Sequence, residues 1–349
     1  MLAAAFAVVI VLDQSKAVAQ SHNGPDSTQL FRIGTGGAQG TYFPIGTLIA
    51  RAISESAESC TRAEGCGVPK LLAVAQQSNG SVSNVEAISA GVLEAGLVQA
   101  DVAHWAYTGT GVFARQKKQA DVRVIASLYR ESVHVVVKRN SGVRSMADLA
   151  GRRVSLDEPG SGTLVDARIV LDAYALEERD LNPVYIKPQF AAEKLTEGTL
   201  DAFFIVAGFP TRSVMELTSR DNATLVPIDA HIARRIEQRY PFLTPSVIPA
   251  DTYPGVPETG TVSVYAQLVV SASLPDDLAY NITRELWSER TLRMLHEGHP
   301  KGREITLDSA LRGLPIPLHP GAERFYRERG LLAAAKRGGE VAASAVELR

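Results

Sequence analysis

The sequence has little of several features that mark common classes of protein. Only two of its 349 residues are cysteine, the formal net charge is −2, and no apolar run reaches the length of about 20 residues that a membrane-spanning helix needs. A net charge so close to zero argues against a nucleic-acid-binding protein, which would normally carry a basic face. No G-x-S-x-G motif is present, and the pair formed by His296 and His299 has no third potential metal ligand nearby. We therefore expect a protein that is not an enzyme and that has no metal or other cofactor.

The N-terminal residues have the pattern of an export signal. Residues 1–12 form a short apolar run, and Ala17, Val18 and Ala19 give the small-x-small pattern of a cleavage site. We therefore predict a signal peptide over 1–19 and a periplasmic protein, although no basic residue precedes the run; the alternative is a buried N-terminal helix. In an exported chain, Cys60 and Cys66 would form a disulfide that closes a small loop, whereas in a cytosolic chain they would be free thiols. We expect the disulfide.

Strand-like and helix-like segments alternate along most of the chain. Strands are expected at 30–34, 71–75, 95–99, 122–128, 133–138, 153–156, 184–187, 200–206, 224–228 and 261–272, and helices at 44–55, 81–90, 146–149, 163–176, 190–197, 210–218, 230–240 and 275–295. This alternation predicts parallel sheets with helices on both faces, and its length favours two α/β lobes over one very large sheet. The segment 241–260, rich in Pro, Thr and Tyr, is expected to be an extended surface segment.

Two glycine-rich segments each lie between a strand and a helix. They are GTGGAQGTY at 34–42 and DEPGSGT at 157–163. Glycine lets backbone N–H groups approach a ligand closely, and the start of a helix favours negative charge. One such segment in each run of alternating elements indicates an anionic ligand held between two lobes. The alternatives are a tight turn for the first segment and a simple helix cap for the second. The glycine spacing does not match a dinucleotide-binding motif.

Two further segments place polar groups where ligands often bind. In NGSVSN at 79–84, Ser81 is a good helix cap and Asn84 lies one turn later. Gln99 follows an apolar strand, and ligands of open α/β sheets bind at such carboxyl ends. For each of these segments a purely structural role is equally consistent with the sequence.

An ordered series of motifs resembles the TAXI group of solute receptors, which serve tripartite ATP-independent periplasmic (TRAP) transporters. The matching segments are IGTGGAQGTYFPIG (33–46), SNGSVSNVEAISAG (78–91), GLVQAD (96–101), ASLYRESVHVVVK (126–138), ADLAGRRVSLDEPGSGT (147–163), LDAFFIVAGFPT (200–211) and PIPLHPGAERFYRERG (315–330). Each segment is weak alone, but their order spans nearly the whole chain after the predicted signal peptide. The loop with Cys60 and Cys66 and the missing basic start depart from the group's pattern.

The resemblance implies a two-lobed periplasmic binding protein of type II-like α/β fold, with two interlobe crossovers and a ligand cleft. The first lobe would comprise 29–129 and 233–335, the second 130–232, with crossovers near 128–133 and 229–235, and 336–349 would be a flexible tail. The ligand would be a small anionic metabolite such as glutamate, glutamine or 2-oxoglutarate, and the partner a TRAP-type membrane permease. We expect a monomer. A sensory module for a membrane signalling partner and a periplasmic enzyme are the alternatives.

The same resemblance implies a set of ligand-binding residues. They are Thr35, Gly36, Gly37, Tyr42, Ser81, Asn84, Gln99, Ser161, Gly162, Thr163, Gly208 and Pro210, with Tyr129 and Glu131 beside the first crossover.

Overall fold

The computed structural model describes residues 28–54 and 66–332. The predicted signal peptide, Cys60 and the predicted tail at 336–349 lie outside these residues. The pairing of Cys60 with Cys66 therefore stays a prediction.

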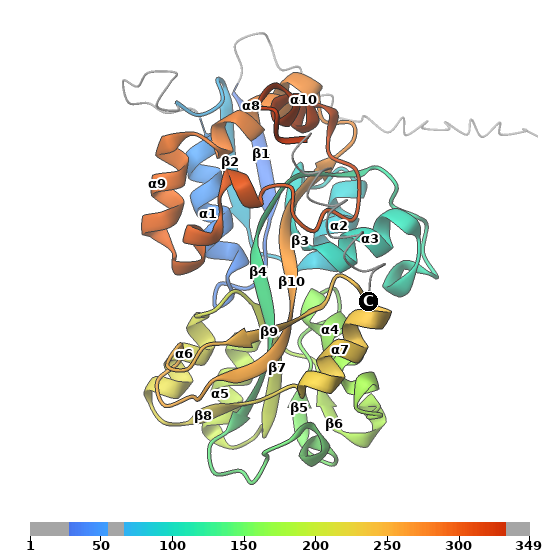
Figure 1. Ribbon diagram of the computed structural model, residues 1–349, viewed down its shortest axis with the longest axis vertical. Helices are drawn as coiled ribbons and strands as arrows, with labels where there is room; N and C mark the ends of the chain where they lie inside the picture. The colour runs from blue at the N-terminus through green and yellow to red at the C-terminus, as the bar shows by residue number, and fades with distance from the viewer. Residues whose placement is uncertain (1–27, 55–65, 333–349) are drawn as a thin grey trace, which may run out of the picture.

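The described residues form an alternating series of strands and helices (Figure 1). The strands are β1 (Gln29–Gly34), β2 (Leu71–Gln76), β3 (Ala95–Gln99), β4 (Val122–Lys138), β5 (Arg153–Ser155), β6 (Asn182–Val184), β7 (Ala202–Ala207), β8 (Ala223–Val226), β9 (Thr244–Ile248) and β10 (Thr259–Ser271). The α-helices are α1 (Tyr42–Ile53), α2 (Ser81–Ser89), α3 (Ala100–Thr108), α4 (Gly162–Ala173), α5 (Pro188–Glu197), α6 (Arg212–Ser219), α7 (Ala230–Arg239), α8 (Asp276–Leu286), α9 (Glu289–Gly298) and α10 (Pro320–Glu328). The predicted α/β fold class is confirmed.

The strands join into one mixed sheet instead of the separate parallel sheets that the sequence indicated. The sheet order is β2-β1-β3-β10-β4-β7-β5-β6, with β8 paired to β4 and β9 paired to β10. The pairs β1–β2, β1–β3, β5–β6 and β5–β7 are parallel, whereas every pair that involves β4 or β10 is antiparallel. The continuity comes from β4, a single strand of 17 residues where two shorter strands were predicted. Nearly all of β4 is buried, as expected for a strand that is covered on both faces.

The elements gather into two groups at opposite ends of β4 and β10 (Figure 1). The first group holds β1 to β3 with α1 to α3 and α8 to α10, and the second holds β5 to β8 with α4 to α7. We call them the first and the second lobe. In the first lobe, α1, α8 and α10 cover one face of the sheet and α2 and α3 cover the other, while in the second lobe α4 and α7 lie opposite α5 and α6.

The second crossover predicted near 229–235 stays a prediction, and the structure shows how the chain runs there. Near 229–235 the structure has the start of α7, which packs against α4 through Arg239 and Asp172, whose side chains are 2.7 Å apart. The chain returns to the first lobe later, along β10, where Ser263 pairs with Ser132 of β4. The apolar face of α7, with Ile232 and Ile236 buried, holds this helix on the second lobe.

Two other expectations are corrected in the last third of the chain. The segment 241–260 contains β9, and its residues Ile248, Tyr253 and Val256 are buried in the core of the second lobe. The helix expected at 275–295 is two helices, α8 and α9, because the Ser288 side chain accepts a hydrogen bond from the Thr291 N–H and starts a new helix.

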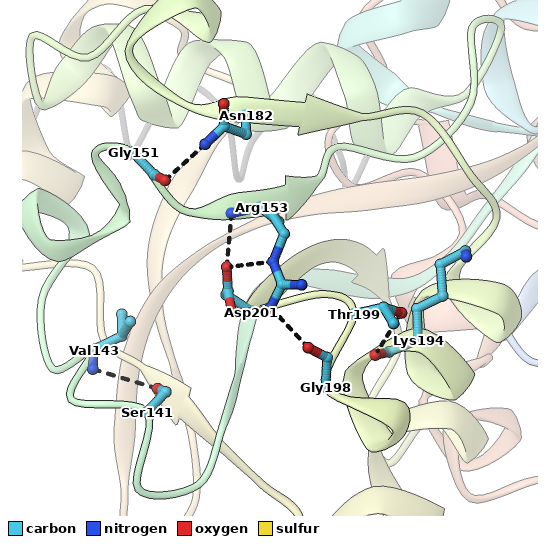
Figure 2. Close-up of polar contacts among 9 residues, drawn as sticks. All are labelled: Ser141, Val143, Gly151, Arg153, Asn182, Lys194, Gly198, Thr199 and Asp201. Atoms are coloured by element: carbon cyan, nitrogen blue, oxygen red, sulfur yellow. Dashed lines mark hydrogen bonds and ion pairs between the residues drawn. The ribbon is translucent and has the colours of Figure 1, made fainter.

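The end of the second lobe away from the carboxyl ends of its strands is held by polar contacts (Figure 2). Figure 2 shows the Arg153 guanidinium facing the Asp201 carboxylate, with Nη2 and Oδ1 2.7 Å apart. Arg153 also donates to the Gly198 carbonyl, and the Asn182 amide donates to the Gly151 carbonyl. The hydrogen bonds from Arg153 hold the pKa of the Asp201 carboxyl below its usual value. These contacts align β5, β6 and the start of β7, whose opposite ends reach the cleft.

Candidate ligand-binding cleft

A cavity of about 600 Å³, part of it open to solvent, lies between the two lobes. Most of its wall is made by residues at or after the carboxyl ends of β1, β2, β3, β5, β6 and β7, where ligands of open α/β sheets bind, and Glu131 of β4 completes it. The lining residues are Gly36, Gly37, Gln39, Gly40, Thr41, Tyr42, Ser78, Asn79, Gly80, Ser81, Gln99, Glu131, Asp157, Ser161, Gly162, Thr163, Lys187, Pro188, Gln189, Ile205, Val206 and Ala207.

On the first lobe, the glycine-rich loop after β1 leads into α1 beside the cavity. Tyr42 is the first residue of α1, and its hydroxyl lies 3.4 Å from the Ser81 hydroxyl at the start of α2. Both side chains are buried, and desolvation, reinforced by the nearby Glu131, raises the pKa of Tyr42. Tyr42 therefore stays neutral and offers a hydroxyl to the cavity.

On the second lobe, the glycine-rich segment after β5 places the start of α4 at the cavity. The Ser161 hydroxyl accepts a hydrogen bond from the Leu164 N–H at 3.0 Å, so the cap role considered from the sequence is present. The Thr163 hydroxyl accepts from the Val206 N–H at 3.1 Å and ties α4 to β7. The first N–H groups of a helix have no acceptor within the helix, so this end remains suited to an anionic group.

Two buried carboxyl groups also face the cavity, which the sequence reading did not emphasise. Desolvation raises the pKa of Glu131 to about 8, and Glu131 Oε1 has no hydrogen-bond partner among the described residues. Desolvation likewise raises the pKa of Asp157 to about 7, beside Ser161 and Thr163. Near neutral pH, Glu131 is therefore mostly protonated, and Asp157 is close to half protonated. The cavity is thus less negative than its carboxyl groups alone would indicate.

Positive charge reaches the cavity from both lobes. Lys187 lines the cavity just before α5, and its Nζ is 3.7 Å from the Glu158 carboxylate. Lys301 lies behind Glu131, is almost fully buried, and binds Glu304 with its Nζ at 2.6 Å from Oε1. Its charge opposes the rise in the pKa of Glu131 but is outweighed by desolvation.

Direct hydrogen bonds between the lobes show that the cleft is closed in this structure. The Ser83 N–H donates to the Gly160 carbonyl at 3.0 Å, and the Thr41 hydroxyl donates to the Gly208 carbonyl at 2.8 Å. On the far side, the Lys301 ammonium lies 3.9 Å from the ring centroid of Phe209. Further links are the Asn79 amide to the Pro159 carbonyl and the Thr211 hydroxyl to the Gln39 carbonyl.

The structure brings most of the predicted ligand-binding residues to this cavity. Those that line it are Gly36, Gly37, Tyr42, Ser81, Gln99, Glu131, Ser161, Gly162 and Thr163. Five of the predicted residues do not line the cavity: Thr35, Asn84, Tyr129, Gly208 and Pro210. Whether the lining residues bind a ligand stays a prediction.

The predicted residues away from the wall act within the protein. The Asn84 amide donates to the carbonyls of Thr35 and Leu97, both at 2.8 Å, and so fixes the end of β1 beside β3. Gly208 leaves room for Lys301, because a Cβ there would lie 2.6 Å from its Cγ. Pro210 follows a cis peptide bond. These residues shape the cleft from behind.

Several lining residues were missed from the sequence. Asp157 begins the DEPGSGT segment but was not among the predicted ligand-binding residues, and its φ of 72° lies in the left-handed region. Lys187 and Gln189 flank Pro188 at the start of α5, and no motif marked them. Their place in the cavity follows from the alignment of β6 with β5.

The fold and the site together define a two-lobed α/β protein with a cleft between its lobes. Residues 33–330 match the model of the NMT1-like family, and the chain belongs to this family. Among solved structures, a protein from Bordetella bronchiseptica RB50 superposes with a TM-score of 0.51 at 15% identity, covering 86% of this chain and 82% of that one. This likeness shows a shared fold.

Two sulfonate-binding proteins are also similar in structure. The putative periplasmic sulfonate-binding protein SsuA of Methylobacillus flagellatus KT gives a TM-score of 0.44 at 18% identity, covering 80% of this chain and 74% of its own. The alkanesulfonate-binding protein SsuA of Xanthomonas axonopodis pv. citri, bound to MOPS, gives 0.46 at 16% identity, covering 89% and 94%.

Two features are absent from residues 28–54 and 66–332. None of their helices is long and apolar enough to cross a membrane. Within the same residues, no group of three or more His, Cys, Asp or Glu side chains is placed to hold a metal ion. His296 instead contacts the Ile305 carbonyl through Nε2 at 3.2 Å, and His299 Nδ1 accepts from the Lys301 N–H at 3.1 Å.

Proposed function

We propose that this protein is a periplasmic solute receptor that captures a small carboxylate and delivers it to a TRAP-type membrane permease. The observation that carries the proposal is the closed cavity between the lobes, onto which the starts of α1 and α4 both open. A ligand enclosed in this way is shielded from water, which strengthens its hydrogen bonds to charged groups. The ligand would be of the glutamate, glutamine or 2-oxoglutarate type, and the receptor would act as a monomer without catalysis.

The carboxylate docks at the start of α4. The N–H groups of Gly162 and Thr163 and the partial positive charge of the helix terminus favour it there. Lys187 supplies a full positive charge from the same lobe. Asp157 occupies the same region, so a carboxylate binds best when Asp157 carries its proton, which its raised pKa permits near neutral pH.

The rest of the ligand contacts the first lobe. Tyr42, Ser81 and Gln99 offer hydroxyl and amide groups there, and protonated Glu131 offers a hydrogen-bond donor. We propose that the two lobes separate by bending of β4 and β10, with the first boundary near residue 130, as the resemblance implied. Ligand bound to both lobes then favours the closed form, which the permease would recognise.

Calorimetry on the chain from residue 20 tests the proposal directly. Titration with L-glutamate, L-glutamine and 2-oxoglutarate at pH 7 should give saturable heat with at least one of them, and the dimethyl ester of 2-oxoglutarate should give none. Absence of heat with every carboxylate, or equal binding of the ester, would contradict the proposal.

A pair of lysine variants tests the docking site. Lys187→Met should weaken binding of the carboxylate by about tenfold, because it removes a partly buried ion pair with the ligand, worth about 1–2 kcal/mol. Lys194→Met is the matched control, since Lys194 lies on the exposed part of α5. Equal affinities of the two variants would place the carboxylate elsewhere.

A further inference from the structure

Two buried aspartates face each other across the boundary between the lobes. Asp101 is the second residue of α3 in the first lobe, and Asp166 lies in α4 in the second lobe. Both side chains are fully buried, and the two carboxyl groups are within hydrogen-bonding reach of each other. The closed arrangement of the lobes is what brings them together.

The surroundings of this pair do not provide enough donors for two charged carboxylates. The Gln99 amide donates to Asp166 Oδ2 at 2.9 Å. Both oxygens of Asp101 and Oδ1 of Asp166 have no hydrogen-bond partner among the described residues. Two adjacent carboxylates without donors repel each other, whereas one proton held between them makes an O–H···O hydrogen bond that satisfies both.

We infer that Asp101 and Asp166 form a proton-binding latch, which holds a shared proton only when the cleft is closed, so that closure takes up a proton. The inference rests on the proposed movement of the lobes and not on the class of ligand. In the open form the two side chains separate and meet water, where each ionises as an ordinary aspartate. In the closed form one proton bridges α3 and α4.

The titratable groups around the latch support this direction. Desolvation raises the pKa of both aspartates, and for Asp101 it outweighs the contact with Asp166, which lowers the pKa of Asp101. The negative charges of Asp101 and of Glu131 on β4 raise the pKa of Asp166 further, and Asp101 likewise raises the pKa of Glu131. His104, one turn along α3, lowers the pKa of Asp101.

Positive charges packed on α4 lie at its other end. Arg235 and Arg239 of α7 bind the Ala173 carbonyl and the Asp172 carboxylate at the carboxyl end of α4. Asp166 therefore has the neutral Gln99, and not a cation, as its hydrogen-bonding partner from β3.

The latch makes the open–closed equilibrium depend on pH. If closure binds one proton, the ratio of closed to open protein falls by up to tenfold for each pH unit, between about 4, where free aspartate titrates, and the raised pKa of the closed pair. Acidic conditions therefore favour the closed form even without ligand.

Small-angle scattering of the ligand-free chain at pH 5, 7 and 9 tests this inference. The radius of gyration should increase with pH in the natural protein. It should change less with pH in the Asp101→Asn/Asp166→Asn double variant, because an amide pair can hydrogen-bond without a proton, and only the response of Glu131 and Asp157 in the cleft remains. Circular dichroism checks that the variant is folded, and the single variant Asp166→Asn replaces it if it is not.

His104→Gln is the control, because His104 lies one turn along α3 and also acts on the charge of Asp101. This variant should keep the pH response. A natural protein whose radius of gyration is independent of pH would overturn the inference, and so would a double variant that keeps the full response or a His104→Gln variant that loses it. The scattering experiment uses no ligand, so its failure is distinct from the absence of carboxylate binding in calorimetry.

Discussion

A single methyl group at Gly162 should prevent full closure while leaving the fold intact. Gly162 begins α4, and a Cβ added to it would lie 1.4 Å from Gln99 Oε1 and 2.9 Å from the Ser81 hydroxyl. Gln99 and Ser81 belong to the first lobe, so the overlap arises only when the lobes meet. Gly162 has no positive φ, and alanine is a better helix former than glycine at the start of a helix. We expect Gly162→Ala to keep or slightly raise the thermal unfolding temperature.

The size of the effect on binding follows from what Gln99 must give up. To clear the new methyl group, the Gln99 side-chain amide has to move by about 2 Å, since non-bonded heavy atoms seldom approach closer than about 3.5 Å. That movement breaks its hydrogen bond to Asp166. A hydrogen bond to a charged group such as the carboxylate of Asp166 contributes about 1.5–3 kcal/mol. Its loss corresponds to a loss of affinity of about 10- to 100-fold.

Calorimetry with the carboxylate that binds best to the natural protein measures this loss, and the Gln99→Ala variant is the matched control. Gln99→Ala removes the same hydrogen bond without adding atoms, so the double variant Gly162→Ala/Gln99→Ala should bind no more weakly than Gln99→Ala alone. This non-additivity is expected for groups in contact. Natural affinity in Gly162→Ala, or fully additive losses in the double variant, would refute the reasoning.

Four further predictions concern charge and stability. Glu131 becomes charged as pH rises through about 8, so calorimetric affinity for an anionic ligand should fall above that pH, and Glu131→Gln should remove this dependence. Tyr253→Phe should lower the free energy of unfolding in urea by about 1–3 kcal/mol, because the hydroxyl bonds His134 Nε2 at 2.9 Å and the Thr211 N–H at 3.0 Å. Burial lowers the pKa of His134 to about 4, so stability is full above pH 6.5 and should decline in urea titrations as pH falls through 4. Ser161→Ala should lower ligand-free stability by about 1 kcal/mol in thermal unfolding, because α4 loses its cap.

The sequence predicts most elements of this fold, because the regular spacing of apolar residues is visible within each segment. It fails where an element depends on distant partners. The polar run Arg130, Glu131 and Ser132 was interpreted as a break between two strands, yet in the structure it pairs with β10 and keeps β4 continuous. Helix α3 was missed because Asp101 and His104 interrupt its apolar pattern, and their burial depends on neighbours far along the chain. No pattern within the segment itself reveals these distant neighbours.

The parts of the candidate site that consist of glycine-rich helix starts could be predicted from the sequence. The parts that consist of side chains from separate elements could not. The glycine-rich segments before α1 and α4 mark helix starts, and the structure places both on one cavity. Lys187 and Gln189 carry no such mark, since only the pairing of strands decides that the start of α5 faces the cleft. Asn84 was in the right region, but its amide is fully engaged with backbone carbonyls, which composition cannot show.

The strands β4 and β10 run through both lobes, and this continuity limits how the proposed separation of the lobes can occur. Because one hydrogen-bonded ribbon belongs to both halves, opening proceeds by flexing and twisting two paired strands, with no loop serving as a free joint. The ribbon has irregular register between Ala266 and Gln267 and again between Leu268 and Val269, beside Ser127 and Ala126 of β4. In the proposed movement of the lobes, we expect bending at these offsets, because the pairing of β4 with β10 is interrupted there. A continuous ribbon would also limit the proposed opening and draw the two lobes back to one arrangement after a ligand leaves.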